Sequence, residues 1–524
     1  MKIIIPLAGK GKRFNDFLSP KPLIEIDGKP MIEHVVNYFP RKSQFIFICN
    51  EDHLAKTDLK HVLKRISPEC QIVSVSHEKG PAYSVLQALD LVDDGEEVIV
   101  NYCDFIQVWD YNNFIIKLTD KKPDGAIISF KGFHPSSLGE TYYAYMKVNE
   151  DQIVQEIKEK ASYSQDRTMD FASTGTYYFS SGNLLKKYVK EFTSNQDYSL
   201  NNEFYMSLVY NLMIKDGLKI MNYEVEKFIC LGTPRDYELY KFWSEFFLKY
   251  SPNLITFDNI NLKVTNIFPL AGDMRDFTEI GIDQLNFLIP IMNKSLIYYS
   301  LKTHPMGIRN ILIMLEKHQE EFNILSYLPS EFKYNSEALF LPKKLAGNAE
   351  TILQARSLVR QDEPVCVSGC NNILDYDERL LSHLMEDKTV DVILFAFSHH
   401  ECVLRNPKGL HYAKTREHIF ATEIVAKEVI SDNPYKDLAL EGTAIYKRAE
   451  DLFSSIDTFL DLKKESNPFF LSAVNLLIER GKKVVIFEVN KFIPLRTVEN
   501  YNEFTYWQDY FDKLSYHPYS KILQ

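Results

Sequence analysis

Short apolar runs alternate with helical patterns along the first half of the chain. Residues 3–5, 44–50 and 97–103 have the pattern of buried strands, because apolar side chains fill most of their positions. Helical patterns cover residues 31–38, close at residues 62–65 and start again at Gly80. The other predicted elements are strands at 71–76, 126–130, 143–148, 153–160 and 173–179, a last strand of the sheet at 225–234, and helices starting within 201–210 and spanning 236–250. This alternation predicts an α/β fold, a parallel sheet wrapped by helices.

The loop after the first strand concentrates glycines and cations. Gly9 and Gly11 alternate with Lys10, Lys12 and Arg13 in the sequence GKGKR, which brings backbone N–H groups and cations into one turn. That combination indicates a site for several phosphates. A dinucleotide-binding motif needs a third glycine and a helix directly afterwards, and a Walker motif closes with Gly-Lys-Ser/Thr. The loop has neither feature, so both alternatives fail.

A further cation, Lys21, stands between two prolines, and residues 23–36 read LIEIDGKPMIEHVV. Together with the glycine loop, this segment resembles the sugar-phosphate nucleotidylyltransferases, also called nucleotide-sugar pyrophosphorylases. The resemblance covers the first half of the chain nearly end to end. It implies Rossmann-like domains, each a mostly parallel mixed sheet flanked by helices.

The sequence of the first half starts again in the second. Phe268-Pro-Leu-Ala-Gly272 repeats Ile5-Pro-Leu-Ala-Gly9, and further echoes follow in the same order. They pair residues 293–297 with 28–32, 347–355 with 80–88, 442–443 with 175–176, and Tyr501 and Trp507 with Tyr237 and Trp243. The spacing, on the order of 265 residues, indicates a duplicated domain rather than a solenoid. We expect two tandem domains, residues 1–252 and 253–524, joined at 251–253 without a flexible tether.

The two copies differ at charged positions, whereas apolar positions repeat. The replacements put Asp273, Met274 and Asp276 where Lys10, Gly11 and Arg13 stood, Asn286 opposite Lys21, Asn371 opposite Asp104, and Arg496-Thr497-Val498 opposite Gly232-Thr233-Pro234. The second copy should therefore keep the fold, lack the reaction and stabilise the first copy.

Composition narrows the class of protein. The 524 residues carry a net charge of −11, which argues against a general nucleic-acid binder, because such a surface repels phosphate backbones. The seven cysteines show no CxxC spacing, so neither a disulfide framework nor a structural zinc site is indicated, and a reducing cytoplasm fits best. No leader pattern and no run of about 18 apolar residues occurs, so we expect a soluble protein without a membrane partner. A homo-oligomer is compatible with these features.

Nucleotidyl transfer joins a phosphorylated acceptor to the α-phosphorus of a nucleoside triphosphate and releases pyrophosphate. An acceptor phosphate is already largely dianionic at pH 7, since its second pKa is near 6, so the reaction needs cations and a metal rather than a general base. We expect Arg13, Lys21 and Asp104 to be the catalytic residues. By the resemblance, Arg13 faces the departing phosphates, Lys21 neutralises the α-phosphate and Asp104 binds Mg²⁺ or Mn²⁺. The predicted nucleotide-binding residues are Leu7, Ala8, Gly9, Lys10, Gly11, Lys12, Gly80, Pro81 and Ala82.

The resemblance also marks an acceptor site and leaves the metal site incomplete. A Glu-Lys pair at residues 159–160 matches the pair that contacts the acceptor in the family. The predicted substrate-binding residues are Glu159, Lys160, Gly175 and Glu203. The family often has a second metal carboxylate where this chain has Cys230, and a thiol is a poor ligand for magnesium. Either one carboxylate suffices beside phosphates and waters, or Asp236 or Glu203 substitutes.

The main interpretation is an enzyme that makes a nucleotide-activated sugar from a nucleoside triphosphate and a sugar 1-phosphate, for surface polysaccharide synthesis. An alternative keeps the chemistry and changes the acceptor to phosphocholine or another small phosphorylated molecule, which the tyrosine-rich second part of the domain permits. A glycosyltransferase would carry Asp-x-Asp, whereas residues 101–105 read NYCDF. A non-enzymatic nucleotide sensor describes the second half better than the whole. The sequence does not identify the base or the acceptor.

Overall fold

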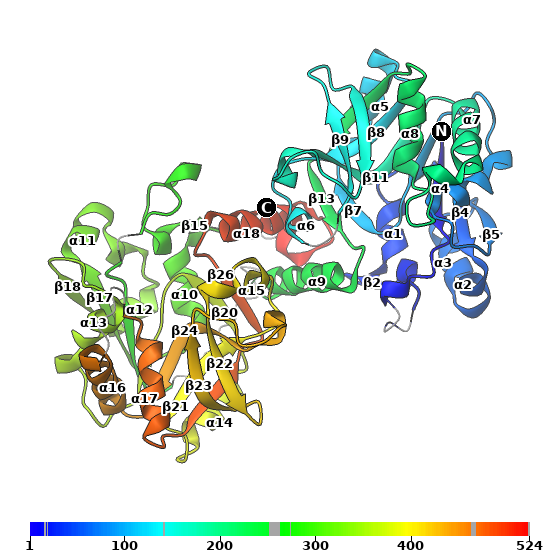
Figure 1. Cartoon of the computed structure of the whole chain (residues 1–524). Helices are drawn as coiled ribbons and strands as arrows, with labels where there is room; N and C mark the ends of the chain where they lie inside the picture. Colours follow the sequence, from blue (N-terminus) through cyan, green and yellow to red (C-terminus); the bar gives the residue numbers. More distant parts are fainter. Residues whose placement is uncertain are drawn as a thin grey trace. The chain divides into compact units, whose positions relative to one another are not determined.

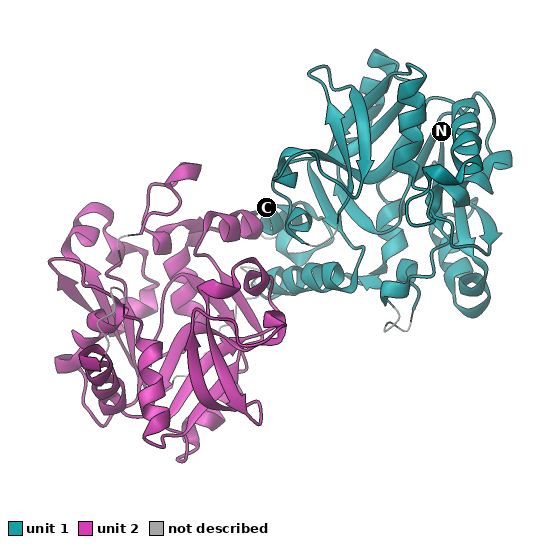
Figure 2. Cartoon of the chain, viewed as in Figure 1, with its two compact units in different colours: residues 1–254, 506–524 teal, residues 255–505 magenta. Residues whose placement is uncertain are grey.

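The computed structural model describes residues 1–14, 17, 19–139, 142–250, 262–272, 274–462 and 468–521. The chain folds into two compact units, residues 1–254 with 506–524, and residues 255–505 (Figure 2). Residues 506–524 therefore belong to the first unit, whereas the predicted division placed all of 253–524 in the second domain. The predicted linker at 251–253 lies outside the described residues, and the domain boundary at residue 252 stays a prediction.

The first unit is built on one mixed sheet with two short ribbons beside it (Figure 1). Its strands are β1 (Lys2–Leu7), β2 (Glu25–Ile26), β3 (Lys29–Pro30), β4 (Gln44–Asn50), β5 (Gln71–Val75), β6 (Val98–Asn101), β7 (Phe105–Val108), β8 (Gly125–Phe130), β9 (Ala144–Val148), β10 (Val154–Glu159), β11 (Phe171–Phe179), β12 (Ile220–Glu224) and β13 (Lys227–Cys230). The sheet order is β10-β9-β11-β6-β1-β4-β5, with β8 paired to β11 and β12 to β8. Strand β1 is parallel to β4 and β6, whereas β11 runs antiparallel to its neighbours.

Helices cover both faces of this sheet. They are α1 (Met31–Val36), α2 (Glu51–Lys56), α3 (Leu59–Ile66), α4 (Pro81–Leu86), α5 (Tyr111–Lys121), α6 (Pro135–Leu138), α7 (Gly182–Ser194), α8 (Met206–Lys215) and α9 (Pro234–Lys249). Ile4 of β1 packs in the cluster formed with α4, α7 and α8, whereas Ile3 and Ile5 pack in the cluster formed with α1, α3 and α5. Because β1 is buried on both faces, its sequence is continuously apolar rather than alternating.

Two predicted elements differ from the structure. The strand expected at 225–234 as the end of the sheet is β13, which pairs with β7 outside the main sheet. The main sheet instead includes β12, which was not predicted because the polar residue Asn222 interrupts its apolar pattern. The Asn222 side chain is buried and accepts from Ser129 Oγ at 2.6 Å. Helix α8 starts only at Met206, because the backbone of Phe204 is bonded to Lys79 and Ala82 instead.

The second unit repeats this architecture. Its strands are β14 (Thr265–Pro269), β15 (Pro290–Ile291), β16 (Lys294–Ser295), β17 (Arg309–Leu315), β18 (Ser336–Leu341), β19 (Val365–Val367), β20 (Asn372–Asp375), β21 (Val392–Phe397), β22 (His411–Arg416), β23 (Phe420–Ala426), β24 (Ala439–Tyr446), β25 (Val484–Glu488) and β26 (Lys491–Pro494). The order β18-β17-β14-β19-β24-β21-β25 matches β5-β4-β1-β6-β11-β8-β12, and the ribbons β20–β26 and β15–β16 match β7–β13 and β2–β3. The predicted α/β class and the tandem repeat are confirmed.

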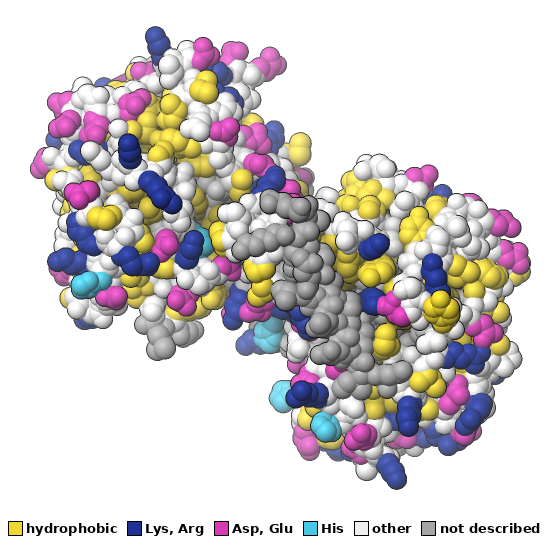
Figure 3. Space-filling view, turned by 180° about the vertical axis from the view of Figure 1, so that it is seen from behind, with side chains coloured by type: hydrophobic (Ala, Val, Ile, Leu, Met, Phe, Trp, Pro, Cys, Tyr) yellow, Lys and Arg dark blue, Asp and Glu magenta, His cyan; other side chains and the backbone are white. Residues whose placement is uncertain are grey.

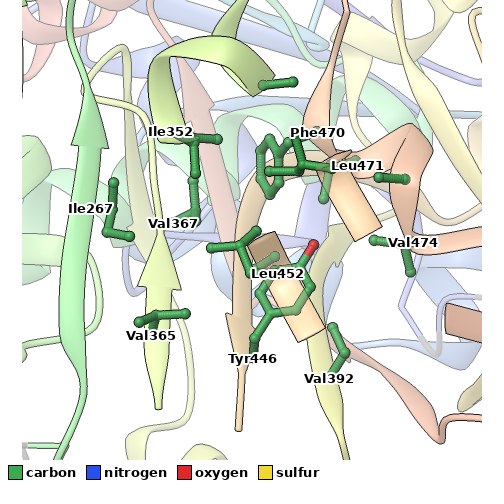
Figure 4. Close-up of a cluster of buried hydrophobic side chains, with 14 of the residues drawn as sticks. Ile267, Ile352, Val365, Val367, Val392, Tyr446, Leu452, Phe470, Leu471 and Val474 are labelled. Carbon is green, nitrogen blue, oxygen red and sulfur yellow. The ribbon is translucent and has the colours of Figure 1, made fainter. Parts of the chain in front are cut away.

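The apolar positions of the second copy form its core. The helices are α10 (Leu296–Thr303), α11 (Glu316–Phe322), α12 (Ser330–Asn335), α13 (Asn348–Leu353), α14 (Glu378–Glu386), α15 (Glu401–Arg405), α16 (Ala449–Leu462), α17 (Val474–Glu479) and α18 (Val498–Lys513), of which α18 continues into the first unit. Figure 4 shows part of this core, where Ile267 of β14 and Tyr446 of β24 share a cluster with Leu452 of α16. The apolar pattern that repeats in the sequence is therefore the pattern that packs the sheet against its helices.

Residues 506–521 pack into the first unit through aromatic side chains. Trp507 stacks on Trp243 of α9 with 6.4 Å between ring centroids. Phe511 and Tyr519 lie 5.6 Å and 4.9 Å from the ring of Phe247. All five side chains are buried. Since an aromatic side chain buries roughly 150–250 Å², this cluster is a substantial part of the core of the first unit.

A fragment of residues 1–252 is expected to be far less stable than the full chain. It lacks the rings of residues 506–521 that cover Trp243 and Phe247, and exposing these two rings costs on the order of 4 kcal/mol. That is a large part of the stability of a typical domain, so we expect aggregation or a melting temperature lower by about 10 °C in a thermal scan. A chain in which a Gly/Ser linker replaces residues 251–505 should recover most of the loss. Equal melting of the fragment and the full chain would contradict this role of residues 506–521.

Among the described residues, every helix is too short or too polar to cross a lipid bilayer. All seven cysteines are free thiols. On the face shown in Figure 3, acidic and basic side chains are interspersed on both units.

Candidate functional site

The glycine loop leaves β1 at the carboxyl end of its parallel neighbours. Leu7 ends β1 and Ala8 is buried, whereas residues 9, 10 and 12 are exposed. Gly11 has a φ of +66°, a conformation that favours glycine. Within the part of the chain that the structure describes, the backbone N–H groups of residues 9–12 donate no hydrogen bond. They are therefore available to an anion.

Glu78 neutralises two cations of this loop. Its carboxylate lies 2.5 Å from Lys10 Nζ and 2.7 Å from Lys12 Nζ. Hydrogen bonds from Lys10 and then Lys12 lower the pKa of Glu78 to about 2, and the bond to Glu78 raises the pKa of Lys10. Sequence reasoning missed this carboxylate, because a single acid before Gly80 carries no pattern. An incoming triphosphate would have to compete with it.

Glu78→Gln is expected to lower the KM for the nucleoside triphosphate about threefold to tenfold. The change keeps the shape and removes a negative charge beside the loop, and one such charge is worth on the order of 1 kcal/mol in water-like surroundings. Initial rates at low and high salt measure the effect, which should shrink as salt screens it. Asp94→Asn is the matched control, because Asp94 is exposed and pairs with Lys186 at 2.6 Å, and it precedes the amino end of β6 rather than the carboxyl end of the sheet. A KM that stays at the parental value would mean that the triphosphate does not displace Glu78.

Lys21 joins three segments that are distant in the sequence. It starts the 3₁₀ helix Lys21–Leu23, and its Nζ donates to Asp104 Oδ2 at 2.7 Å and to the Gly232 carbonyl at 3.1 Å. The side chain is only 15% exposed. Burial lowers the pKa of Lys21, but the charge of Asp104, the hydrogen bond to Asp104 and the nearby thiols of Cys103 and Cys230 together outweigh burial, so the pKa is raised. Lys21 therefore stays charged in a largely buried position.

Arg13 stands apart from this pair. It lies in the 3₁₀ helix Lys12–Phe14 and is exposed, and among the described residues it forms no ion pair. Phe14 of the same turn is buried, and its ring centroid lies 5.3 Å from Lys21 Nζ. The structure thus brings Lys21 and Asp104 together and leaves the guanidinium of Arg13 in solvent at the loop.

The turn at Gly80 packs against the segment that precedes α8. With a φ of +86°, Gly80 leaves no room for a side chain, since a Cβ would lie 2.6 Å from the backbone nitrogen of Phe204. Pro81 starts α4. Ala82 is buried, and its N–H donates to the Phe204 carbonyl at 2.9 Å. Of these three predicted nucleotide-binding residues, Ala82 already has a protein partner for its N–H.

The predicted acceptor residues form two hydrogen-bonded groups. Glu159 ends β10 and accepts from Ser207 Oγ at 2.5 Å, and burial raises the pKa of Glu159. Lys160 Nζ donates to Tyr205 Oη at 2.8 Å, and Tyr205 in turn donates to Glu203 Oε2 at 2.6 Å. Tyr205 is not among the residues predicted for this site. The structure shows that its hydroxyl links Lys160 to Glu203.

Gly175 connects the acceptor side to the turn that carries Asp104. It lies at a bulge of β11 with a φ of +99°, and a Cβ there would lie 2.9 Å from the ring of Tyr102. The N–H of Tyr102 donates to the Gly175 carbonyl at 3.0 Å, and the Tyr102 hydroxyl accepts from the N–H of Met206 at 3.3 Å. A side chain at residue 175 would therefore displace the turn just before Asp104.

The surroundings of Asp104 decide which metal the site fits. A Cβ on Gly232 would lie 3.1 Å from Cys230 Sγ, 3.7 Å from Asp236 Oδ2 and 3.8 Å from Asp104 Oδ2, so these groups line one turn. Burial, followed by the charges of Asp236 and Asp104, raises the pKa of the Cys230 thiol well above its ordinary value. Asp236 Oδ2 accepts from both the N–H and the hydroxyl of Thr233 in a helix cap.

One carboxylate therefore remains for a metal. Asp104 lies in the turn between β6 and β7, and its side chain is 36% exposed. No three His, Cys, Asp or Glu side chains gather into a metal-binding group in the described ranges. Magnesium keeps several waters and is commonly held by one or two carboxylates plus substrate phosphates. The donors present at Asp104 fit that ion and do not fit a metal enclosed by protein.

In the second copy, the residues that correspond to the glycine loop and Lys21 bond to each other instead. Asn286 starts the 3₁₀ helix Asn286–Leu288, as Lys21 starts its own, which supports pairing the two positions. Asn286 Nδ2 donates to Asp276 Oδ2 at 2.8 Å, and its Oδ1 accepts from the N–H of Asp276 at 2.9 Å. Asp273 lies outside the described residues. The asparagine thus holds an acid where the first copy has Arg13.

Arg496 occupies the position that corresponds to Gly232. The N–H of Leu495 donates to the Asn371 carbonyl at 3.0 Å, as that of Leu231 donates to the Asp104 carbonyl at 2.8 Å. The guanidinium of Arg496 donates to the Glu441 carbonyl, and burial lowers the pKa of Arg496 against the opposing charge of Glu441. Where the first copy has a glycine turn, the second therefore has a half-buried arginine side chain that is hydrogen-bonded.

Comparison with known proteins finds the same match in both halves. A family model described as nucleotidyl transferase matches residues 2–209 and 280–520. Bifunctional protein GlmU from Bartonella quintana (strain Toulouse) is 22% identical over 241 residues, 45% of this chain and 51% of GlmU, so the chain spans about half the length of that relative. The solved nucleoside-diphosphate-sugar pyrophosphorylase from Vibrio cholerae RC9 is 22% identical, with a TM-score of 0.38 over 45% of this chain and 98% of its own. The inositol-1-phosphate CTP transferase from T. maritima is 17% identical, with a TM-score of 0.36 over 46% and 95%.

Proposed function

The chain belongs to the nucleotidyl transferase family, and from this premise we propose that its first copy transfers a nucleoside monophosphate to a sugar 1-phosphate and releases pyrophosphate. The family membership and the duplication predicted from the sequence are confirmed by the match in both halves. One observation carries the proposed reaction. A charged, largely buried Lys21 is held by Asp104 and the Gly232 carbonyl beside a glycine loop whose N–H groups have no partner among the described residues.

In the proposed reaction, a phosphate oxygen of the acceptor attacks the α-phosphorus. The bond from that phosphorus to the oxygen that bridges to the β-phosphate breaks, and its electron pair leaves with pyrophosphate. The N–H groups of residues 9–12 would bind the β- and γ-phosphates, Arg13 would face the leaving group and Lys21 the α-phosphate. Because negative charge moves onto the leaving group as the bond breaks, cations already in place stabilise the transition state more than the ground state.

We propose that Mg²⁺, or Mn²⁺ in its place, is held by Asp104 together with phosphate oxygens and water. Bound there, the ion would neutralise charge on the phosphates. Asp104 supplies the oxygen donor that such an ion prefers, and the buried, neutral thiol of Cys230 would not compete. The pair with Lys21 keeps the Asp104 carboxylate in place and neutralised before substrates bind.

The acceptor would lie against residues 159–160. Lys160 would meet its phosphate and Glu159 its hydroxyl groups, which favours a phosphorylated sugar. A specific observation favours phosphocholine as the second candidate. Lys160 Nζ lies 4.9 Å from the centroid of the Tyr205 ring, and the Tyr205 hydroxyl donates to Glu203 Oε2 at 2.6 Å. An aromatic ring that already faces a cation, next to a carboxylate, suits a quaternary ammonium group.

We propose that the second copy does not catalyse the reaction. Asp276, Asn286 and Asn371 replace two cations and the metal carboxylate, and an acid near a triphosphate disfavours its binding. We also place the reaction in the cytoplasm, where the seven free thiols stay reduced, and its product in surface polysaccharide synthesis. The role in surface polysaccharide synthesis is supported by residues 202–205, which resemble the corresponding segment of single-domain family members that act in that synthesis.

A pyrophosphate-release screen tests the proposal. Purified full-length protein is incubated with Mg²⁺ and each nucleoside triphosphate against a panel of sugar 1-phosphates, phosphocholine and other phospho-alcohols. We expect release with one triphosphate and one class of acceptor, and none without an acceptor. Release with phosphocholine alone would select the second candidate. A chain that binds triphosphate but releases pyrophosphate in no combination would be a nucleotide sensor, and the proposal would fail.

A further inference from the structure

The segment that holds Lys21 is continuous with an edge strand. Strand β13 runs into Leu231 and Gly232, whose carbonyl accepts from Lys21 Nζ at 3.1 Å. One side of β13 pairs with β7. On the other side, the outward polar groups of alternate residues need partners, because an unpaired buried N–H or C=O is costly. The N–H of Cys230 donates to Ser136 Oγ at 2.9 Å.

Tyr506 is the partner of the other outward residue, Phe228. Its hydroxyl accepts from the Phe228 N–H at 2.9 Å and donates to the Phe228 carbonyl at 2.9 Å, as a neighbouring strand would. His134 Nδ1 lies 2.9 Å from the same hydroxyl and also accepts from the Phe228 N–H, at the longer distance of 3.4 Å. The Tyr506 side chain is buried, so these contacts are shielded from water.

An ion pair between a buried lysine and a half-exposed aspartate fixes Tyr506 against β13 from the side. Lys227 Nζ lies 4.4 Å from the centroid of the Tyr506 ring and 2.7 Å from Asp509 Oδ2, one turn further along α18. Lys227 itself is buried. Tyr506 and Asp509 of α18 therefore contact two consecutive residues of β13, Phe228 and Lys227. The position of this strand thus depends on the C-terminal segment.

We propose that Tyr506 is a positioning residue for the active site of the first copy. By holding β13, it sets where the Gly232 carbonyl meets Lys21 and where the N–H of Leu231 meets the Asp104 carbonyl. Helix α18, which begins in the second copy, thus influences catalysis in the first copy through Tyr506, without contributing a residue that contacts the substrates. The kinetic part of this inference rests on the proposed function, and the structural part does not.

Tyr506→Phe in the full chain tests the inference, with Tyr510→Phe as the matched control. Tyr510 is also a buried tyrosine of α18, but its hydroxyl faces Tyr240 Oη at 3.5 Å and not β13. We expect Tyr506→Phe to speed amide hydrogen exchange at residues 228–232 at least tenfold. We also expect kcat to fall about tenfold with both KM values changed less than twofold. Tyr510→Phe should leave both readouts at parental values.

The two measurements separate the ways in which the inference can fail. Parental exchange and parental kcat in Tyr506→Phe would overturn it. Equal effects in both variants would reduce Tyr506 to an ordinary contributor to stability, which also overturns it. If the parental chain released no pyrophosphate, the proposed function would fail, and the exchange rates would still decide whether Tyr506 positions β13.

Discussion

Lys21→Ala is expected to lower the turnover number about 10³-fold while the chain stays folded. Removing one preplaced charge or donor from a transition state typically costs this much, on the order of 3–4 kcal/mol. Lys21 contacts both Asp104 and the Gly232 carbonyl, so its ammonium group is fixed before substrate arrives and needs little reorganisation. Pyrophosphate release at saturating substrates measures the loss. The KM for the triphosphate should change far less, because the charge matters most as the leaving group departs.

Lys2→Ala is the matched control. Lys2 Nζ also contacts a carboxylate, Glu96 at 3.0 Å, and a backbone carbonyl, that of Leu91 at 2.6 Å. The side chain of Lys2 is 14% exposed and that of Lys21 is 15% exposed. Lys2 lies at the start of β1, whereas the glycine loop follows the end of β1. Both substitutions should lower the melting temperature by similar amounts, and only Lys21→Ala should lose turnover. Near-parental turnover in Lys21→Ala would remove Lys21 from the proposed mechanism.

Local sequence was enough to predict the strands that carry the site. β1 is an uninterrupted apolar run followed by glycines, so neither its burial on both faces nor the loop depends on distant contacts. The repeat was also readable, because each copy must fill the same core. β12 was not, since its buried Asn222 is stabilised by a partner on β8, and a polar residue whose partner is 93 positions away gives no local signal.

The site itself was predictable only as a set of residue types. The glycine loop, Lys21 and Asp104 follow from their spacing and from the resemblance, but the bond between Lys21 and the Gly232 carbonyl joins residues 211 positions apart. Glu78 and Tyr506 belong to no motif, and each acts through a contact that only the folded chain creates. The predicted division of the chain placed residues 506–524 in the second domain for the same reason. A repeat reveals common ancestry of two segments, whereas the partner of a terminal helix is set by packing.

Asp104→Asn is expected to lower the maximal rate at least about 100-fold and to raise the Mg²⁺ concentration that gives half of it. The amide keeps the size of the side chain and can still accept a hydrogen bond from Lys21, but it lacks the charge that attracts a hard cation. Titration of pyrophosphate release with Mg²⁺, and of Mn²⁺ binding by electron paramagnetic resonance, measures both effects. Asp216→Asn is the control, because Asp216 also pairs with a lysine, Lys187 at 3.0 Å, at an exposed position outside the proposed site.

The titration distinguishes two roles that Asp104 could have. If its carboxylate only oriented Lys21, the asparagine would preserve that hydrogen bond, and both the rate and the Mg²⁺ concentration needed would change little. A metal ligand predicts a shift in that concentration instead. The second copy carries this substitution naturally at Asn371, but Asn371→Asp should restore no activity there, because Arg496 still fills the adjacent turn and Asn286 still holds Asp276. Activity gained by Asn371→Asp in a Lys21→Ala background would contradict the assignment of catalysis to the first copy alone.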